Sequence, residues 1–244
     1  EVVASSEETH FTHIPPDSSW NVSKDSAYLH YTSNETIGGV EFYGIPNDHG
    51  LPLVADFSSN ILSRPLDISR FGLIYAGAQK NMGPAGITVV IVREDLIGKA
   101  IPATPSVLDY AQQSENGSML NTPPTYPWYL LGLVLDWLKS KGGLTAIAEL
   151  NDRKAEKLYR AIDGSDFYSN PVDPSARSRM NVPFTIRDAS LEKQFLQEAK
   201  ERGLVNLEGH RSVGGFRASI YNAMPEAGVD ALIDHMRLFE QAHG

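Results

Sequence analysis

The chain has 244 residues, of which 41% are apolar and 21% charged, and its net charge is −9. This length can form one large domain or two modest ones, and the negative charge argues against non-specific binding to nucleic acid. The absence of cysteine excludes disulfides, thiolate metal sites and cysteine nucleophiles, and no apolar run is long enough to span a membrane.

Short apolar runs in the first part of the chain predict a β-sheet. Candidate strands lie at 27–31, 51–55 and 71–76, and the last two are continuously apolar, as buried parallel strands are. The β-branched run at 87–92 is the clearest strand. It follows its predecessor after a Gly/Pro loop that is too short for a parallel crossover, so these two strands should be antiparallel. We therefore expect a mixed, mostly parallel sheet.

Two helices are expected next. Residues 127–140 are apolar nearly all round, which predicts burial on most faces of the helix. Residues 144–162 have an amphipathic pattern, with Gly142 and Gly143 before them and Gly164 at their end.

The last part of the chain has a different order of predicted elements. Ser190 is the expected N-cap of a helix. The order strand, helix, two strands, helix is predicted at 180–186, 190–203, 204–207, 214–220 and 225–242. This order is typical of a compact α+β domain. We place the domain boundary within the long helix near residue 150, which gives a large domain at 1–149 and a small domain at 150–244.

Lys80 and Asp56 are the most informative pair of residues. Lys80 follows the strand at 71–76 among small residues, and Asp56 follows the strand at 51–55. Between apolar strand ends, the lysine should have a depressed pKa, as a Schiff-base lysine needs. Such an amine can bind pyridoxal phosphate (PLP), and the carboxylate can keep the pyridine nitrogen of PLP protonated. From the residues alone, a solvated lysine and a turn-capping aspartate remain open alternatives.

A cationic segment lies near the C-terminus. His210, Arg211 and Arg217 flank Gly214 and Gly215 in an otherwise acidic protein. Such a cluster suits a dianionic ligand, although a solvated loop explains it equally well. We expect no metal site, because the nearest candidate pair, two histidines at 10 and 13, lacks a third ligand.

Five segments, in order along nearly the whole chain, closely resemble the phosphoserine aminotransferase family: 32–36, 55–59, 75–81, 121–125 and 208–219. That family belongs to the class V, fold-type I PLP aminotransferases. The resemblance implies an α/β fold, in which a large domain carries a mixed sheet with helices on both faces and a smaller α+β domain follows. It also implies PLP as the cofactor.

The resemblance implies roles for four residues around the cofactor. Lys80 is the Schiff-base lysine and the base that moves the substrate proton. Asp56 is the partner of the pyridine nitrogen. Thr36 donates to the phenolic oxygen of the ring, and Gln79 binds the cofactor phosphate.

Further roles concern the substrate and a second subunit. The resemblance implies a homodimer in which Asn121 and Thr122 bind the phosphate of the partner's cofactor. Arg217 binds the substrate α-carboxylate, and His210 and Arg211 bind the substrate phosphate or the distal carboxylate of glutamate. A planar, bidentate contact of the Arg217 kind suits arginine better than lysine.

The implied reaction converts O-phospho-L-serine and 2-oxoglutarate into 3-phosphohydroxypyruvate and L-glutamate, in serine biosynthesis and, in bacteria, pyridoxine biosynthesis. We expect a cytoplasmic enzyme. One alternative is another class V transaminase, of the serine–pyruvate or alanine–glyoxylate type, which would need no residues that bind a substrate phosphate. A second is an inactive, truncated dimerising module.

The family's subunit is longer at its N-terminus. The extra part carries a Gly-Arg phosphate loop, an aromatic residue that stacks on the ring, and an Arg and a His that contact the substrate, and none of these has a counterpart here. We expect the sequence to be a partial one.

Overall fold

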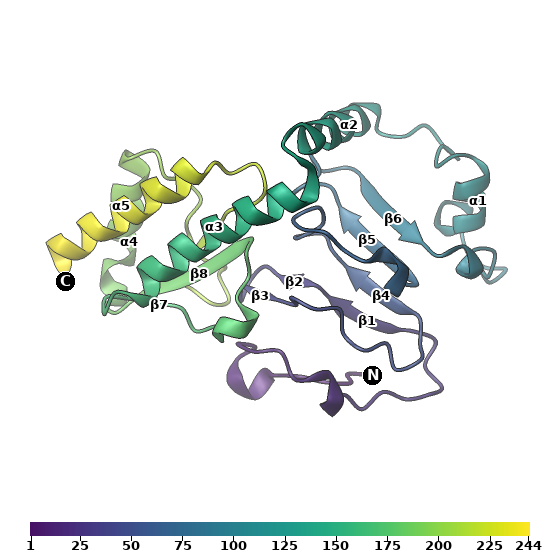
Figure 1. The fold of residues 1–244 in the computed structure, drawn as a ribbon, viewed down its shortest axis with the longest axis horizontal. Coiled ribbons are helices and arrows are strands. Elements are labelled where there is room, and N and C mark those ends of the chain that lie inside the picture. Colours follow the sequence, from purple (N-terminus) through teal and green to yellow (C-terminus); the bar gives the residue numbers. More distant parts are fainter.

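The computed structural model describes residues 1–244, which form two groups of elements (Figure 1). The first group is built on a four-stranded sheet in the order β1-β4-β5-β6. Its strands are β1 (Leu29–Thr32), β4 (Leu53–Asp56), β5 (Leu73–Gly77) and β6 (Thr88–Val92). β1, β4 and β5 are parallel and β6 is antiparallel to β5, so the predicted mixed sheet is confirmed.

A small hairpin stands beside this sheet. β2 (Asn34–Glu35) pairs with β3 (Val40–Glu41), with Asn34 opposite Glu41. Glu41 is fully buried: Asn60 Nδ2 donates to its Oε1 at 3.1 Å, and the backbone N–H of Arg179 donates to its Oε2 at 2.8 Å. Glu41 therefore ties the hairpin to both groups of elements.

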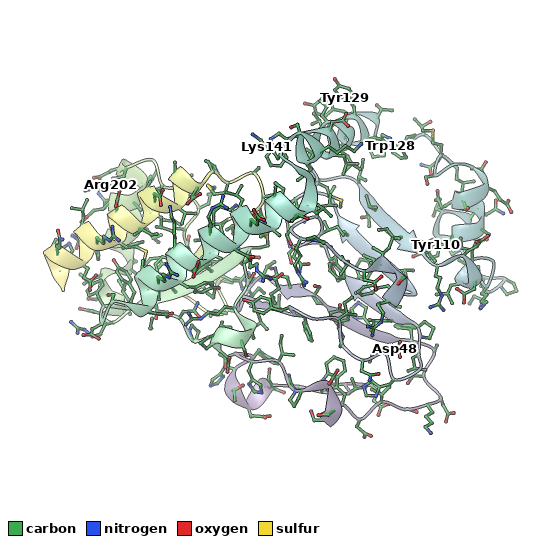
Figure 2. The ribbon with its side chains drawn as sticks, viewed as in Figure 1. Asp48, Tyr110, Trp128, Tyr129, Lys141 and Arg202 are labelled. Atoms are coloured by element: carbon green, nitrogen blue, oxygen red, sulfur yellow. The ribbon has the colours of Figure 1, made fainter.

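The helices α1 (Tyr110–Glu115) and α2 (Thr125–Ser140) follow the sheet. The prediction that α2 is buried on most faces is wrong for this chain, because Leu138 is its single buried residue. Tyr126 and Tyr129 are 68% and 63% exposed, and Tyr129 projects from the outer side of the helix (Figure 2). Leu131 packs against the first core, whereas other apolar residues of α2, among them Leu133, remain exposed.

The long helix α3 (Gly143–Asp163) connects the two groups (Figure 1). The second group has an antiparallel sheet in the order β7-β8-β9. Two further helices, α4 and α5, complete it. The bounds are β7 (Tyr168–Ser169), β8 (Asn181–Ile186), α4 (Glu192–Glu201), β9 (Phe216–Ser219) and α5 (Glu226–His243).

Two local predictions in this region are wrong. Asp188, not Ser190, supplies the cap: its carboxylate accepts the Ser190 N–H at 2.9 Å and starts a short 3-10 turn before α4. Residues 204–207 form no strand, and the partner of β9 on that side is a single bridge between Glu208 and Phe216. The Leu204 N–H donates instead to the Ala199 carbonyl at 2.9 Å, so the start of this segment closes the end of α4 and does not pair with a strand.

Each group has its own apolar core. One core joins 11 buried residues between Leu29 and Met82, and the other joins 20 between Ala155 and Phe239. In the second core, Phe195 packs its ring 4.5 Å from Phe216 and 5.1 Å from Phe239, centroid to centroid. The domain boundary near residue 150 remains a prediction. None of the helices is long and apolar enough to cross a membrane.

Candidate active site

The candidate site lies where the parallel strands of the first sheet end. Asp56 is the last residue of β4, and its neighbours in register are Thr32 on β1 and Tyr75 on β5. Lys80 follows three residues after the end of β5. The carboxyl ends of parallel strands meet at one edge of the sheet, and that edge is where open α/β sheets bind their ligands.

Asp56 is held by the turn that follows it. Its Oδ1 accepts the backbone N–H of Ser58 at 2.7 Å. The Ser58 hydroxyl accepts the N–H of Gly77 at 3.0 Å, so the turn after β4 is bonded to the end of β5. The turn-capping role that the sequence left open is therefore present, and it fixes the carboxylate at the strand edge.

Lys80 is half-buried, and burial lowers the pKa of its amine, as the sequence predicted. The carboxylates of Asp56 and Glu35 act in the opposite direction on this pKa, and the guanidinium of Arg217 lowers it further. Asp56 ends β4, Lys80 follows the neighbouring strand β5, and Arg217 is bonded to the Thr36 carbonyl, so the three side chains belong to the same edge of the sheet. A lysine with a depressed pKa has more of the neutral amine that attacks a carbonyl group.

Arg217 reaches the site from the second group of elements. It lies on β9 opposite Pro183, and its Nη1 donates to the backbone oxygen of Thr36 at 3.0 Å. Its Nε is buried and has no hydrogen-bond partner. A buried N–H without an acceptor is costly, so this atom marks a place that suits an oxygen ligand.

The remaining cofactor candidates are less enclosed. Thr36 is half-buried beside Arg217, while Gln79 is exposed next to Lys80. Asn121 and Thr122 are exposed in the loop before α2, and Asn121 Nδ2 donates to the Thr122 carbonyl at 3.3 Å. The structure thus gathers Lys80, Asp56, Thr36 and Arg217 and gives Asn121 and Thr122 no contact with them.

His210 and Arg211 lie on a tight loop that enters β9. The His210 carbonyl accepts the N–H groups of Val213 and Gly214, both at 2.9 Å, and Gly209 N–H donates to the Gly215 carbonyl at 2.9 Å. The His210 ring contacts the Ser212 hydroxyl at 2.7 Å, and Arg211 is exposed. A Cβ on Gly209 would stand 2.1 Å from the Gly214 oxygen, so this loop requires glycine there.

The site contains residues to which the sequence pointed only weakly or not at all. Asn81, next to Lys80, is buried and bonded to the backbone of Asn222 at 3.0 Å. Tyr75 contacts His30 and is the neighbour of Asp56 in register. Asn81 and Tyr75 stand within the segment around Lys80, so their positions could have suggested a role. No feature of the sequence points to Asn222 or His30.

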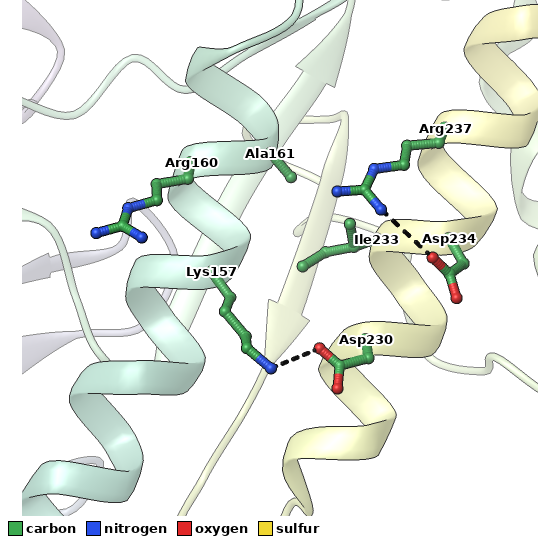
Figure 3. Close-up of a pocket in the computed structure, with 7 residues that line it drawn as sticks. All are labelled: Lys157, Arg160, Ala161, Asp230, Ile233, Asp234 and Arg237. Carbon is green, nitrogen blue, oxygen red and sulfur yellow. Dashed lines mark hydrogen bonds and ion pairs between the residues drawn. The ribbon is translucent and has the colours of Figure 1, made fainter.

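A shallow groove elsewhere on the surface does not share these features (Figure 3). It has a volume of about 380 Å³ and lies between α3 and α5. Its cations face carboxylates: Lys157 is 2.9 Å from Asp230, and Arg237 is 3.6 Å from Asp234. Paired charges on an open surface give little reason to expect a specific ligand.

The residues at the sheet edge fit PLP. They combine a half-buried amine, a carboxylate fixed at a strand end and an arginine with an unsatisfied buried N–H. Residues 2–232 match the family model described as aminotransferase class-V. The chain belongs to the class V aminotransferases. Within that class it belongs to the phosphoserine aminotransferases, which are PLP-dependent, as its relatives show.

Two curated phosphoserine aminotransferases illustrate the similarity. The protein of Pseudomonas paraeruginosa is 60% identical over all of this chain and 67% of its own length. The protein of Hahella chejuensis is 61% identical over 98% of this chain and 66% of its own length. The chain therefore spans about two thirds of the length of these relatives.

Solved structures agree on the fold. The phosphoserine aminotransferase from Bacillus circulans subsp. alkalophilus superposes with a TM-score of 0.98 at 46% identity, covering 100% of this chain and 68% of that one. An alanine–glyoxylate aminotransferase from a Nostoc species superposes with a TM-score of 0.67 at 15% identity, over 87% of this chain and 61% of that one, and shows the shared fold alone. The fold-type I aminotransferase architecture that the sequence predicted is confirmed.

Proposed function

We propose that this protein transfers the amino group of O-phospho-L-serine to 2-oxoglutarate, with PLP as its cofactor, and that it serves serine biosynthesis. The observation that carries the proposal is the convergence of Lys80, Asp56 and Arg217 at one sheet edge in a chain of this family. A role in pyridoxine biosynthesis and a location in the cytoplasm are parts of the same proposal.

Three residues would perform the chemistry. Bound PLP supplies the conjugated ring that accepts the electron pair left on the substrate Cα. Lys80 forms the covalent bond to the cofactor and then moves the proton from Cα. Asp56, anchored by Ser58, holds the proton on the pyridine nitrogen. Arg217 would donate from its Nε, which has no acceptor in the structure, to the substrate α-carboxylate.

The other proposed contacts select the ligand. Thr36 would donate to the phenolic oxygen of the ring, and Gln79 would bind the cofactor phosphate. His210 and Arg211 would read the phosphate of the substrate, because their loop places an exposed guanidinium and an imidazole beside the strand that carries Arg217. A transaminase for alanine or glyoxylate would need no such pair.

A second copy of the chain would complete the site. We propose a homodimer in which Asn121 and Thr122 bind the phosphate of the partner's cofactor. Their exposure in the loop before α2 supports this assignment, and so does the uncovered apolar surface of α2, where Tyr126 is 68% exposed. Several exposed apolar side chains on one helix are typical of a protein–protein contact.

The test is a visible absorption spectrum of the purified chain with added PLP, before and after O-phospho-L-serine. We expect the band of lysine-bound PLP, its loss on addition of phosphoserine, and no such response to L-alanine. Lys80→Arg should abolish the band, whereas Lys139→Arg, at an exposed position, should keep it. A band that responds to alanine but not to phosphoserine would refute the substrate assignment, and the absence of a band would refute the cofactor assignment.

The role of His210 and Arg211 has its own test. Arg211→Ala should raise the KM for phosphoserine about tenfold or more, because an Arg–phosphate contact is a charge-assisted hydrogen bond. The KM for glutamate should change in the same direction if the same pair reads its distal carboxylate. Arg202→Ala, at the exposed end of α4, is the matched control. Equal KM values for Arg211→Ala and the unchanged protein would contradict the assignment.

A further inference from the structure

Tyr75 connects Asp56 with a histidine that has no role in the proposed reaction so far. Tyr75 is the neighbour of Asp56 in register, and His30 lies one strand further away, on β1. The rings of His30 and Tyr75 stack with centroids 6.0 Å apart and planes 18° apart. The His30 Nε2 and the Tyr75 hydroxyl oxygen are 3.0 Å apart. Three neighbouring strands thus place His30, Tyr75 and Asp56 on one face of the sheet, with Tyr75 in contact with His30 and next to Asp56 in register.

The direction of each hydrogen bond follows from what the groups can donate. Burial, the charge of Asp56 and a hydrogen bond to its carboxylate raise the pKa of Tyr75, so the hydroxyl keeps its proton. An ionised carboxylate only accepts, and a hydroxyl has one proton, so Tyr75 donates that proton to Asp56. The tyrosine oxygen can then only accept from His30. This requires the His30 tautomer with its proton on Nε2.

We infer that His30 and Tyr75 are positioning residues that hold the carboxylate of Asp56 toward the pyridine nitrogen of PLP. The inference rests on the proposed function, since it assumes that Asp56 meets that nitrogen. Ser58 N–H fixes Oδ1 at 2.7 Å from one side, and Tyr75 acts on the carboxylate from the neighbouring strand. Two donors on one carboxylate restrict its rotation, and an outer partner of this kind tunes the group that touches the ligand.

A merely structural role predicts different behaviour. His30 is exposed and Tyr75 is only half-buried, so their contact could add a small increment to the stability of the sheet. In that case substitutions would change the free energy of unfolding and leave the protonation of the cofactor nitrogen unaffected. The two roles are therefore separated by a signal from that nitrogen.

The experiment uses PLP labelled with ¹⁵N at the pyridine nitrogen and bound to the chain, with the ¹⁵N chemical shift and the Kd for PLP as readouts. Tyr75→Phe removes one hydroxyl and keeps the ring. His30→Phe keeps the stacked ring and removes the N–H donor. Tyr168→Phe is the matched control, because Tyr168 loses a hydrogen bond to the Met236 carbonyl, 2.8 Å long, in the other core.

We expect Tyr75→Phe to move the ¹⁵N shift toward that of the unprotonated ring and to weaken PLP binding about tenfold, as the loss of a hydrogen bond to a charged group implies. His30→Phe should change the ¹⁵N shift and the Kd for PLP in the same directions as Tyr75→Phe does, but by smaller amounts. Because His30 acts through Tyr75, the double variant should equal Tyr75→Phe alone. Tyr168→Phe should leave the ¹⁵N shift unchanged.

Two results would overturn the inference. Unchanged ¹⁵N shifts in Tyr75→Phe and His30→Phe, with PLP still bound through Lys80, would refute it and leave the proposed function intact. Additive effects in the double variant would show that His30 does not act through Tyr75. If Tyr75→Phe fails to fold, His30→Phe decides alone, because its side chain is exposed. A chain that forms no lysine-bound PLP at all would instead refute the proposed function and the inference with it.

Discussion

The side chain of Asn81 accepts the backbone N–H of Asn222 at 3.0 Å, so the residue after Lys80 is bonded directly to the turn that follows β9. Asn81 also donates from its Nδ2 to the carbonyl of Ile61 at 3.0 Å. Asn222 in turn accepts from Asn151 at 2.9 Å and donates to Leu62 at 2.9 Å. These buried amides join the group of elements that carries Lys80 to the group that carries Arg217.

The amide contacts should make a large contribution to stability. Asn222→Ala removes the acceptor for the buried Asn151 amide and the donor to the Leu62 carbonyl. We expect the free energy of unfolding to fall by about 2–3 kcal/mol, measured by urea unfolding. Asn116→Ala, which removes one exposed bond to the Gln112 carbonyl, should cost about 0.5 kcal/mol or less. Equal losses in both variants would contradict the role of the buried amides.

A buried lysine holds the same turn. Lys154 on α3 is fully buried, and its Nζ donates to the carbonyls of Ile220, Tyr221 and Met224 at 2.9, 2.8 and 3.1 Å. Lys154→Met should lower the free energy of unfolding near pH 7 by about 3 kcal/mol, because three carbonyls lose the donor that this buried side chain supplies. Lys157→Met removes surface ion pairs with Glu226 and Asp230 and is the control, with an expected cost of at most about 1 kcal/mol. A loss no larger than that of the control would contradict the prediction.

The same lysine predicts a pH dependence. Burial lowers the pKa of Lys154 to about 8 from its ordinary value of 10.5. Between these two pH values the unfolded chain binds more protons than the folded one, so this group makes the folded state more stable as pH rises. The difference in unfolding free energy between the unchanged protein and Lys154→Met should therefore increase from pH 8 to pH 10. The comparison cancels the titration of tyrosines, which both proteins share. A difference that stays constant or falls would contradict the prediction.

The sequence predicted the sheet well and the contacts between the two groups poorly. The β-branched run at 87–92 and the short loop before it fixed the antiparallel edge, because both are local features. Asn151 and Asn222 are 71 positions apart, and neither stands in a pattern that singles out a buried polar residue. The exposure of α2 could not be predicted either, because the sequence of a helix that is apolar on all faces does not show which element covers it.

In the candidate site, too, the local features could be predicted from the sequence and the long-range contacts could not. Lys80 and Asp56 follow strand ends, so their approach could be predicted from the order of the elements. Arg217 arrives from the second group, and its contact with the Thr36 carbonyl spans 181 positions. His30 and Tyr75 meet because of the register across three strands, which the sequence does not specify.

Arg217→Lys tests the proposed fork for the α-carboxylate. A lysine would have a single charged nitrogen at the end of a flexible stem and could not satisfy both the Thr36 carbonyl and a carboxylate with fixed geometry. We expect kcat/KM for phosphoserine to fall about a hundredfold, with the visible band of lysine-bound PLP retained. Arg187→Lys, at an exposed position after β8, should have no effect. Retention of at least half of the original kcat/KM in Arg217→Lys would contradict the assignment.

The exposed face of α2 gives the last prediction. Leu133 is 46% and Leu135 37% exposed on this helix, which leaves apolar surface in contact with water. If this face contacts a second copy, Leu133→Glu would place a charge in the contact, where an unpaired carboxylate is costly. We expect sedimentation equilibrium to show a dimer for the unchanged chain and a dissociation constant at least tenfold higher for Leu133→Glu. Leu238→Glu, on the exposed side of α5 with the same 46% exposure, is the matched control and should leave the dimer intact. A monomer in both cases, or equal weakening by both substitutions, would show that α2 is not the contact surface.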